Sequence, residues 1–291
     1  MTMTVIVPLD GSPSAERELP IAATLARRSG GSVVLFTARD SGVPVDVDGY
    51  LAEQESRFGV VAEHQISEHR DIPVSLAKIA ETHDDPVIVM SSRGPNGINE
   101  VVIGSITADT LRLTDAPVLL LGPHVKIVPS PTDPPYETLI VCLDGSHGAE
   151  SILPIAQRWA KLLGLTMWIV QVVDPSIKRR VEGGLAHEAV DESGYVHRVA
   201  RKLSSAEFET EFDVLHEDAH HPARALVRFA EGLPRPIIAM TTHGHTGLRG
   251  LVAGDVTMNV VRHATCPVLV VRPHDPAGNE QHTSDRKHAL A

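Results

Sequence analysis

The sequence predicts an α/β protein with two tandem doubly wound domains. Each domain is expected to hold a five-stranded parallel sheet, in the strand order 3-2-1-4-5, with helices on both faces. Two observations carry this prediction. Short, continuously apolar segments alternate with segments of helical period, as parallel strands covered by helices require. The whole pattern occurs twice within 291 residues, a length that suits two domains.

The repeat is visible when the chain is compared with itself. An offset of 134 superposes residues 139–145 (LIVCLDG) on residues 5–11 (VIVPLDG). An offset of 150 superposes residues 237–255 on residues 87–105, with three glycines in register. The offsets differ by 16, so the second copy has a net insertion of 16 residues between its second and fourth strands. The charged stretch 176–203 is the expected place for this insertion.

The first repeat begins with an apolar, β-branched segment at residues 5–9, which predicts a buried strand ending in a turn at 10–12. A helix is expected next, with Ser12 or Ser14 as its N-cap and apolar residues at helical spacing until a double glycine. Pro20 lies inside this expected helix and predicts a bend. The remaining expected elements are strands at 32–38, 60–66, 87–90 and 117–121 and helices at 50–58, 74–83 and 105–114.

The second repeat follows a stretch with five prolines at 122–138, and it duplicates the helix proline of the first. After its first strand at 139–145, strands are expected at 166–173, 212–216, 237–240 and 267–271, and a helix at 222–231. The predicted organisation is a first domain at 1–124, a stiff linker at 125–137, a second domain at 138–274 and a polar, disordered tail at 275–291.

Composition indicates a globular protein. Apolar residues make up 42% of the chain, and no apolar run approaches the about 20 residues of a membrane span, so no membrane contact is expected. The formal net charge of −11 disfavours nucleic acid as a partner. No signal-peptide pattern precedes the first strand, so a cytoplasmic location is expected. Cys142 and Cys266 are expected to be reduced, buried thiols.

The candidate site combines an acidic strand end with a glycine loop before a helix. In an open parallel sheet, ligands bind beyond the carboxyl ends of the strands, where the connections diverge. Asp10 and the loop containing Gly94 stand at two such ends, side by side if the first and fourth strands are neighbours. Gly104 and Ser105 begin a helix whose free amides favour phosphate, and Asp10 suits a ribose or adenine group. Taken alone, these glycines are better explained by tight turns between packed elements.

Together these motifs resemble the universal stress protein family. Its nucleotide-binding members carry G-x-x-G-x9-G-[ST] after the fourth strand and an Asp after the first. The resemblance extends over residues 4–121 and 138–271 and indicates a tandem two-domain member. The motif positions are Ser91, Gly94, Gly104 and Ser105 in the first repeat and Thr241, Gly244, Gly254 and Asp255 in the second.

The resemblance implies a strong adenine-nucleotide site in the first repeat and a weaker one in the second. It also implies that the final strands, around Val118 and Val268, pair across the interface between the domains. The implied binding residues are Asp10, Ala38, Met90, Ser91, Gly94, Gly104, Ser105 and Ile106 in the first repeat, and Asp144, Val172, Met240, Gly244, Gly254 and Asp255 in the second.

Both repeats depart from the family motif. Ser91 and Thr241 replace the first glycine, which adds bulk and a hydroxyl near the ribose. Asp255 replaces the final Ser or Thr, and a carboxylate beside a phosphate costs up to about 4 kcal/mol at an effective dielectric near 20. That is roughly a thousandfold loss of affinity unless Mg²⁺ bridges the anions. The first repeat is therefore the favoured site.

The function implied by the resemblance is ATP binding by a cytoplasmic stress-response protein. ATP, alone or with Mg²⁺, is expected to bias conformation or assembly and so contact with unidentified protein partners. A homo-oligomer is expected on top of the intrachain domain pairing. Two alternatives stay open, namely an interaction scaffold of the same family without nucleotide and a weak ATPase. The sequence has no P-loop or nucleophile elbow, and the histidine-rich stretch 216–221 lacks metal-ligand spacing, so neither a catalytic residue nor a metal site is expected.

Overall fold

The computed structural model shows the predicted alternation of strands and helices. It describes residues 2–39, 46–68, 71–92, 103–125, 136–174, 188–204, 210–218, 221–242 and 255–273. The strands of the first half are β1 (Thr4–Pro8), β2 (Ser32–Ala38), β3 (Ala62–Ser67), β4 (Pro86–Ser91) and β5 (Val118–Leu121). Those of the second half are β6 (Thr138–Leu143), β7 (Thr166–Val173), β8 (Thr210–His216), β9 (Pro236–Thr241) and β10 (Val268–Val271).

The helices fall into the same two sets. The first half contains α1 (Pro13–Glu16), α2 (Leu19–Ser29), α3 (Val47–Phe58), α4 (Ile72–Thr82) and α5 (Ser105–Leu113). The second half contains α6 (His147–Glu150), α7 (Leu153–Leu163), α8 (Glu188–Leu203), α9 (Pro222–Glu231) and α10 (Asp255–His263).

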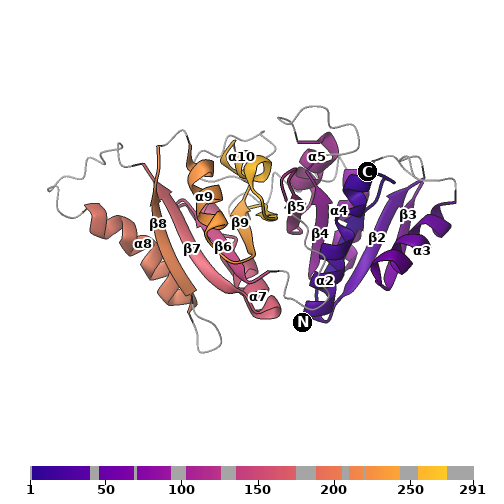
Figure 1. Ribbon diagram of the computed structural model, residues 1–291, viewed down its shortest axis with the longest axis horizontal. Coiled ribbons are helices and arrows are strands. Elements are labelled where there is room, and N and C mark those ends of the chain that lie inside the picture. Colours follow the sequence, from indigo (N-terminus) through magenta and orange to yellow (C-terminus); the bar gives the residue numbers. More distant parts are fainter. Residues whose placement is uncertain are drawn as a thin grey trace, which may run out of the picture.

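A ten-stranded sheet connects the described strands, in the order β3-β2-β1-β4-β5-β10-β9-β6-β7-β8 (Figure 1). Each half has the order 3-2-1-4-5 from its outer edge to the centre, with parallel neighbours, so the predicted fold class is confirmed. β5 and β10 pair antiparallel at the centre, where Leu119 lies opposite Leu269. This confirms the predicted pairing of the final strands, and the two halves share one continuous sheet.

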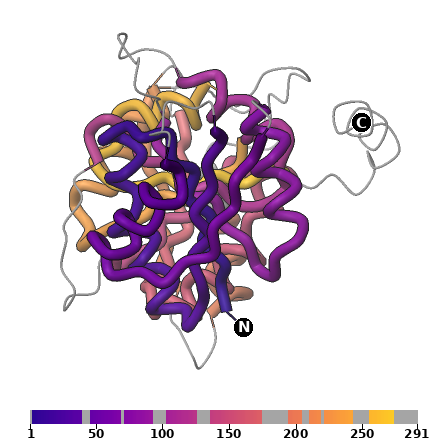
Figure 2. Tube along the Cα trace, turned by 90° about the vertical axis from the view of Figure 1, so that its right-hand side faces the viewer, coloured from indigo at the N-terminus to yellow at the C-terminus, as the bar shows by residue number. Residues whose placement is uncertain are grey.

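Helices cover both faces of the sheet, and each face has its own apolar core. Residues of β1 alternate between the two, since Val5 and Val7 belong to one core and Ile6 to the other. The first core lies under α2, α3, α7 and α8, and it includes Leu51 and Trp159. The second lies under α4, α5, α9 and α10. Each core contains residues of both halves. In the view of Figure 2, the first half lies in front of the second.

Polar contacts add to the sheet pairing between the halves. α2 and α7 pack side by side (Figure 1), and Arg158 of α7 forms an ion pair with Asp85, just before β4, at 2.6 Å. Arg272, which follows β10, donates through Nη1 to the Arg112 carbonyl oxygen in the last turn of α5 at 2.6 Å. The C-terminal end of α5 is therefore held by a residue of the second half.

The helix predicted around Pro20 is wrong in one respect. The segment forms two helices, α1 and α2, and Pro20 stands in the first turn of α2, so it does not bend a continuous helix. Proline is tolerated there because the first amides of a helix have no intrahelical acceptor. Pro154 occupies the same position in α7.

The pairing register locates the insertion in the second half. Val33 of β2 pairs with Ala62 of β3, and the equivalent pair in the second half is Met167 of β7 with Thr210 of β8. The offset therefore grows from 134 (167 − 33) to 148 (210 − 62) between these strands. Fourteen of the 16 residues (148 − 134) enter between β7 and β8, around α8, and two enter before β9. This confirms the predicted place for most of the insertion.

Both cysteines are free thiols, as predicted. Burial raises the pKa of the Cys142 thiol and raises that of Cys266 to about 12. Cys142 is partly exposed as a residue, although its thiol is buried. No helix in the described ranges is long and apolar enough to cross a membrane. Most of the expected linker and all of the tail from 275 lie outside the described residues, and the domain boundaries stay predictions.

Candidate functional site

The carboxyl ends of β1, β2 and β4 meet at one edge of the sheet. Ile6 of β1 lies opposite Val34 of β2 on one side and Ile88 of β4 on the other. The register therefore brings Asp10, just after β1, to the same edge as Ser91, the last residue of β4. The chain moves outward from β1 to β2 and inward from β4 to β5, so this edge is a switch point of the kind at which open α/β sheets bind ligands. The predicted juxtaposition of Asp10 with the end of the fourth strand is confirmed.

Asp10 organises the turn that leads from β1 into α1. Its Oδ1 accepts the Ser12 N–H at 2.9 Å, and the Ser12 Oγ in turn accepts the Ala15 N–H at 3.3 Å as the N-cap of α1. Gly11 has a φ of 77°, a left-handed conformation that glycine adopts at no steric cost. Asp10 is partly exposed at this edge.

The second half builds the same turn. Asp144 Oδ1 accepts both the Ser146 N–H at 3.0 Å and the Ser146 hydroxyl at 2.6 Å. Ser146 Oγ caps α6 by accepting the Ala149 N–H at 3.1 Å, and Gly145 has a φ of 83°. The acidic strand ends of the two repeats are therefore structurally equivalent.

The glycine loop reaches the edge at the start of α5. Gly104 is the N-cap residue, and its N–H donates to the Ser92 carbonyl oxygen at 2.9 Å. No side chain caps the first turn of α5 in the part of the chain that the structure describes. Ser105 and Ile106 are exposed at this end, Ile106 to 45%. The amides of this turn therefore offer partial positive charge to an anion.

The equivalent helix in the second half, α10, has a negative charge at its first position. Thr257 Oγ1 donates to the Thr241 carbonyl oxygen at 2.9 Å, as Thr107 Oγ1 donates to that of Ser91 at 3.1 Å. The two helices are thus attached to β9 and β4 in the same way. The exposed Asp255 carboxylate complements its own helix dipole, typically by about 0.3–1 kcal/mol, in the place that the resemblance reserves for phosphate.

Other predicted site residues have limited access to a ligand. Ala38, Met90 and Met240 are 2%, 4% and 6% exposed, and the methionine side chains belong to the second core. Contacts predicted for these residues would come from their backbone atoms. Val172 is partly buried. Gly94, Gly244 and Gly254 lie outside the described residues, so their roles stay predictions.

Glu18, which lies beneath this edge, was not predicted from the sequence. Glu18 is 1% exposed, and its carboxylate accepts the backbone N–H of Ser91. Burial raises its pKa well above the ordinary value; nearby Asp10 raises it further, while the Ser91 hydrogen bonds and Arg17 oppose the rise. The signal for this residue was available in the repeat, because the offset of 134 pairs Glu18 with Ile152.

A tyrosine–glutamate pair also flanks each acidic turn. The Tyr50 hydroxyl lies 3.4 Å from Glu16 Oε1, and Tyr195 donates to Glu150 Oε1 at 2.9 Å. Burial is the main cause that raises the pKa of both tyrosines, and the glutamates add to it. Arg57 pairs with Glu16 at 2.8 Å. These pairs attach the helix after the second strand of each half to the rim of the candidate site.

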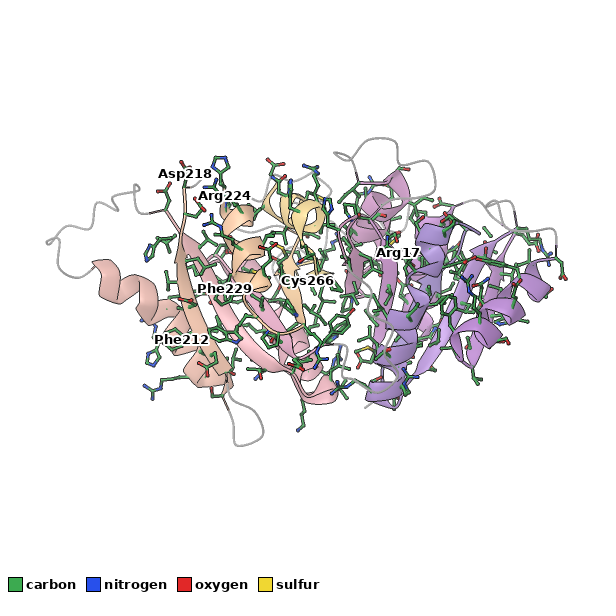
Figure 3. All side chains as sticks on the ribbon, in the orientation of Figure 1. Arg17, Phe212, Asp218, Arg224, Phe229 and Cys266 are labelled. Atoms are coloured by element: carbon green, nitrogen blue, oxygen red, sulfur yellow. The ribbon has the colours of Figure 1, made fainter. Side chains whose placement is uncertain are left out.

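The histidine-rich stretch shows ion pairing where it is described. Glu217 forms ion pairs with Arg224 at 2.7 Å and Arg228 at 3.2 Å. Figure 3 labels Arg224 and Asp218, the residue after Glu217. The bond to Arg224 is the main cause that lowers the pKa of Glu217. Within the ranges that the structure describes, no group of three or more His, Cys, Asp or Glu residues is placed to hold a metal ion.

The fold and the edge together define a class: a tandem doubly wound α/β protein with an aspartate turn at the switch point of each half. The chain belongs to the universal stress protein family, since the model described as "Universal stress protein family" matches residues 45–122 and 135–272, more than half of the chain. The tandem membership predicted from the sequence is thereby confirmed.

Similar proteins are bacterial universal stress proteins. The chain is 24% identical to Universal stress protein Slr1230 of Synechocystis sp., over 92% of this chain and 99% of that protein. It is 26% identical to Universal stress protein Rv1996 of Mycobacterium tuberculosis, over 72% of this chain. That match spans 65% of the mycobacterial protein, just under two thirds of its length.

Solved structures share the fold of the whole chain. A universal stress protein from Archaeoglobus fulgidus DSM 4304 superposes with a TM-score of 0.63 at 18% identity, over 92% of this chain and 98% of the other. The functionally unknown protein PA1789 from Pseudomonas aeruginosa PAO1 gives 0.56 at 16% identity, over 94% and 93%. These likenesses extend over both halves and support the tandem arrangement of the fold.

Proposed function

We propose that this universal stress protein binds ATP at the switch-point edge of its first half. One observation carries the proposal: Asp10, the end of β4 and the uncapped first turn of α5 converge there. Free amides at a helix start suit phosphate groups, and an aspartate at a neighbouring strand end suits a ribose or adenine group. The family motif around Ser105 supports an adenine nucleotide as the ligand.

The second half is the weaker site in this proposal. Its aspartate turn at Asp144 matches the first, but Asp255 adds a carboxylate at the helix start where a phosphate would rest. The repulsion lowers affinity unless Mg²⁺ bridges the carboxylate and the phosphate. One molecule of ATP per chain is the expected stoichiometry.

Bound nucleotide acts, in this proposal, on the contact between the halves. The N-terminal end of α5 faces the ligand, and its C-terminal carbonyl at Arg112 accepts a hydrogen bond from Arg272 of the second half. A ligand that shifts α5 would therefore also change this contact between the two halves. The proposed result is a change in conformation or homo-oligomeric assembly that alters contact with unidentified protein partners in the cytoplasm.

Nucleotide extraction tests this function. Purified protein is denatured by heat, and the supernatant is separated and analysed for adenine nucleotides, with Asp10→Ala and Gly104→Ala processed in parallel. ATP near one molecule per wild-type chain, reduced in both variants, is expected. Protein without adenine nucleotide that also shows no calorimetric ATP binding would rule the proposal out.

An interaction scaffold without nucleotide is the second candidate. It is favoured by the Ser91 N–H, at the position of the first motif glycine, which already donates to the chain's own Glu18 carboxyl group. In the second half, the Asp255 carboxylate also favours the scaffold, because it repels a phosphate. A negative extraction together with retained folding would make the scaffold the better account.

A further inference from the structure

Glu18 places a carboxyl group in the interior of the first half, directly before α2. Only 1% of its surface is exposed. One carboxyl oxygen, Oε1, accepts the Ser91 N–H. The other, Oε2, is buried and has no hydrogen-bond partner among the described residues. Buried polar atoms are normally paired, so this oxygen requires an explanation.

Burial and a neighbouring carboxylate disfavour the negative charge of Glu18, and the Ser91 hydrogen bonds and Arg17 offset this only in part. Asp10, from the turn after β1, adds a like charge nearby. Arg17, labelled in Figure 3, precedes Glu18 in the chain, but its Nη2 donates to the Val125 carbonyl oxygen at 2.8 Å. β4 contributes the uncharged Ser91, whose hydroxyl donates to the Ser14 carbonyl oxygen at 2.9 Å. Burial, the largest effect, raises the pKa of Glu18, so this carboxyl keeps its proton when exposed glutamates have lost theirs.

The fold itself does not need a carboxyl group at this position. In the second half the equivalent residue is Ile152, which is fully buried before α7. α1 and α2 of the first half match α6 and α7 of the second, with the same serine cap and the same proline. An isoleucine therefore supports the same architecture without the cost of burying an unpartnered carboxyl oxygen. Glu18 stands in the half whose helix start lacks the Asp255 carboxylate.

We infer that Glu18 is a positioning residue for the first-half site and that an anionic phosphate binds there while Glu18 is protonated. This inference rests on the proposed function. Neutral Glu18 holds the Ser91 amide, and through it the end of β4 where the motif loop starts. Ionised Glu18 would add a second negative charge beside Asp10, at the edge where the phosphate must enter. Ligand binding at high pH therefore includes the uptake of one proton.

The test is a series of ATP titrations from pH 5 to 9.5 with wild type, Glu18→Gln and Glu18→Ile. Glutamine keeps the acceptor for the Ser91 N–H and has no charge. The pH dependence of the Glu18→Gln Kd therefore comes from groups other than residue 18, including ATP itself, and it serves as the baseline for wild type. Isoleucine copies the second half and removes that acceptor. Urea unfolding at each pH confirms that the variants compared are folded.

The ratio of the wild-type Kd to the Glu18→Gln Kd is expected to rise at least tenfold across this range. The ratio of the Glu18→Ile Kd to the Glu18→Gln Kd should not change with pH. Its value should be about three or more, because isoleucine removes the acceptor for the Ser91 N–H. Parallel pH profiles for wild type and Glu18→Gln, or equal affinities for Glu18→Gln and Glu18→Ile, would overturn the inference alone. Failure of all three proteins to bind ATP at every pH would overturn the proposed function and this inference together.

Discussion

At the scale of single residues, Glu18 and Ile152 hold opposite chemistry at equivalent positions. Both side chains are buried before a helix that begins with Leu-Pro, yet one is ionisable and the other is not. We expect this difference to make the stability and ligand binding of the first half depend on pH in a way that the second half does not share.

The stability of the folded protein should report this sensitivity directly. The unfolded pKa of Glu is about 4.3, and the folded pKa of Glu18 is raised above it by burial. The contribution of Glu18 to stability is fully present below about pH 4.3 and is lost as the pH rises toward its folded pKa, at about 1.4 kcal/mol per pH unit. Glu18→Gln should lack this loss and gain on wild type with rising pH, as measured by urea unfolding.

The matched control for that measurement is Glu53→Gln, which removes an exposed carboxyl group of α3. It should follow the wild-type pH dependence of unfolding. A Glu18→Gln curve parallel to both wild type and Glu53→Gln would show that Glu18 ionises as freely in the folded protein as in the unfolded chain.

Asp255 is the residue expected to weaken the second site. Asp255→Ser restores the motif residue and removes the carboxylate from the helix start, so ATP should bind the second half at least tenfold more tightly. The titration is done in an Asp10→Ala background, which weakens the first half, and the affinity of the second binding event per chain is followed. Asp255→Asn is the control for shape, since it removes the charge and keeps the size. Unchanged affinity in both variants would contradict the electrostatic explanation.

At the scale of helices and strands, most of the fold was predictable because buried parallel strands are continuously apolar. The ends of helices were less predictable, because they depend on capping hydrogen bonds. The helix expected at 50–58 begins at Val47, because Asp46 Oδ1 accepts the Gly49 N–H at 3.0 Å. The separation of α1 from α2 was not predicted, because the apolar residues of the two helices follow the spacing of a single helix. Glu18 was missed because its burial depends on how α2 meets β4, which no local pattern records.

The central seam gives a prediction at the same scale. Gly122 follows β5, and a Cβ added there would lie 2.1 Å from the Val261 carbonyl oxygen of α10. Gly122→Ala should therefore force the halves apart locally and destabilise the protein by about 1–3 kcal/mol. Urea unfolding measures the effect.

Gly232→Ala is the control for the seam, because its added Cβ would meet its nearest neighbour, the Phe229 carbonyl oxygen, at 3.4 Å. Its free energy of unfolding should change by no more than about 0.5 kcal/mol. Equal losses in the two variants would mean that the close approach at Gly122 does not limit packing between the halves.

At the scale of the whole molecule, the antiparallel pairing of β5 with β10 relates two similar halves by an approximate two-fold axis. An isolated first half, residues 1–124, would expose the β5 edge and the adjacent apolar core. We expect this fragment to form a dimer in which β5 pairs with its own copy and Leu119 lies opposite Leu119. Sedimentation equilibrium checks this, and a folded, stable monomer would contradict it.

The predictions for the site depend on how the two halves combine. The acidic turns and helix starts were predictable because they follow local motifs, and the register confirmed that the first turn lies beside the end of β4. The inequality of the halves was predicted from Asp255, because a charge at a helix start is visible in the sequence. The repeat also pairs Glu18 with Ile152, but the burial of Glu18 is seen only in the structure.

The most direct test of ATP binding by the first half is calorimetric titration of the full chain with ATP. Wild type, Asp10→Ala and Asp144→Ala are compared at neutral pH. A hydrogen bond to a charged group contributes about 1.5–3 kcal/mol, so Asp10→Ala should weaken binding roughly tenfold to a hundredfold. Asp144→Ala should bind as wild type does, with one ATP per chain. Equal binding by wild type and Asp10→Ala, or loss of binding in Asp144→Ala, would contradict the account.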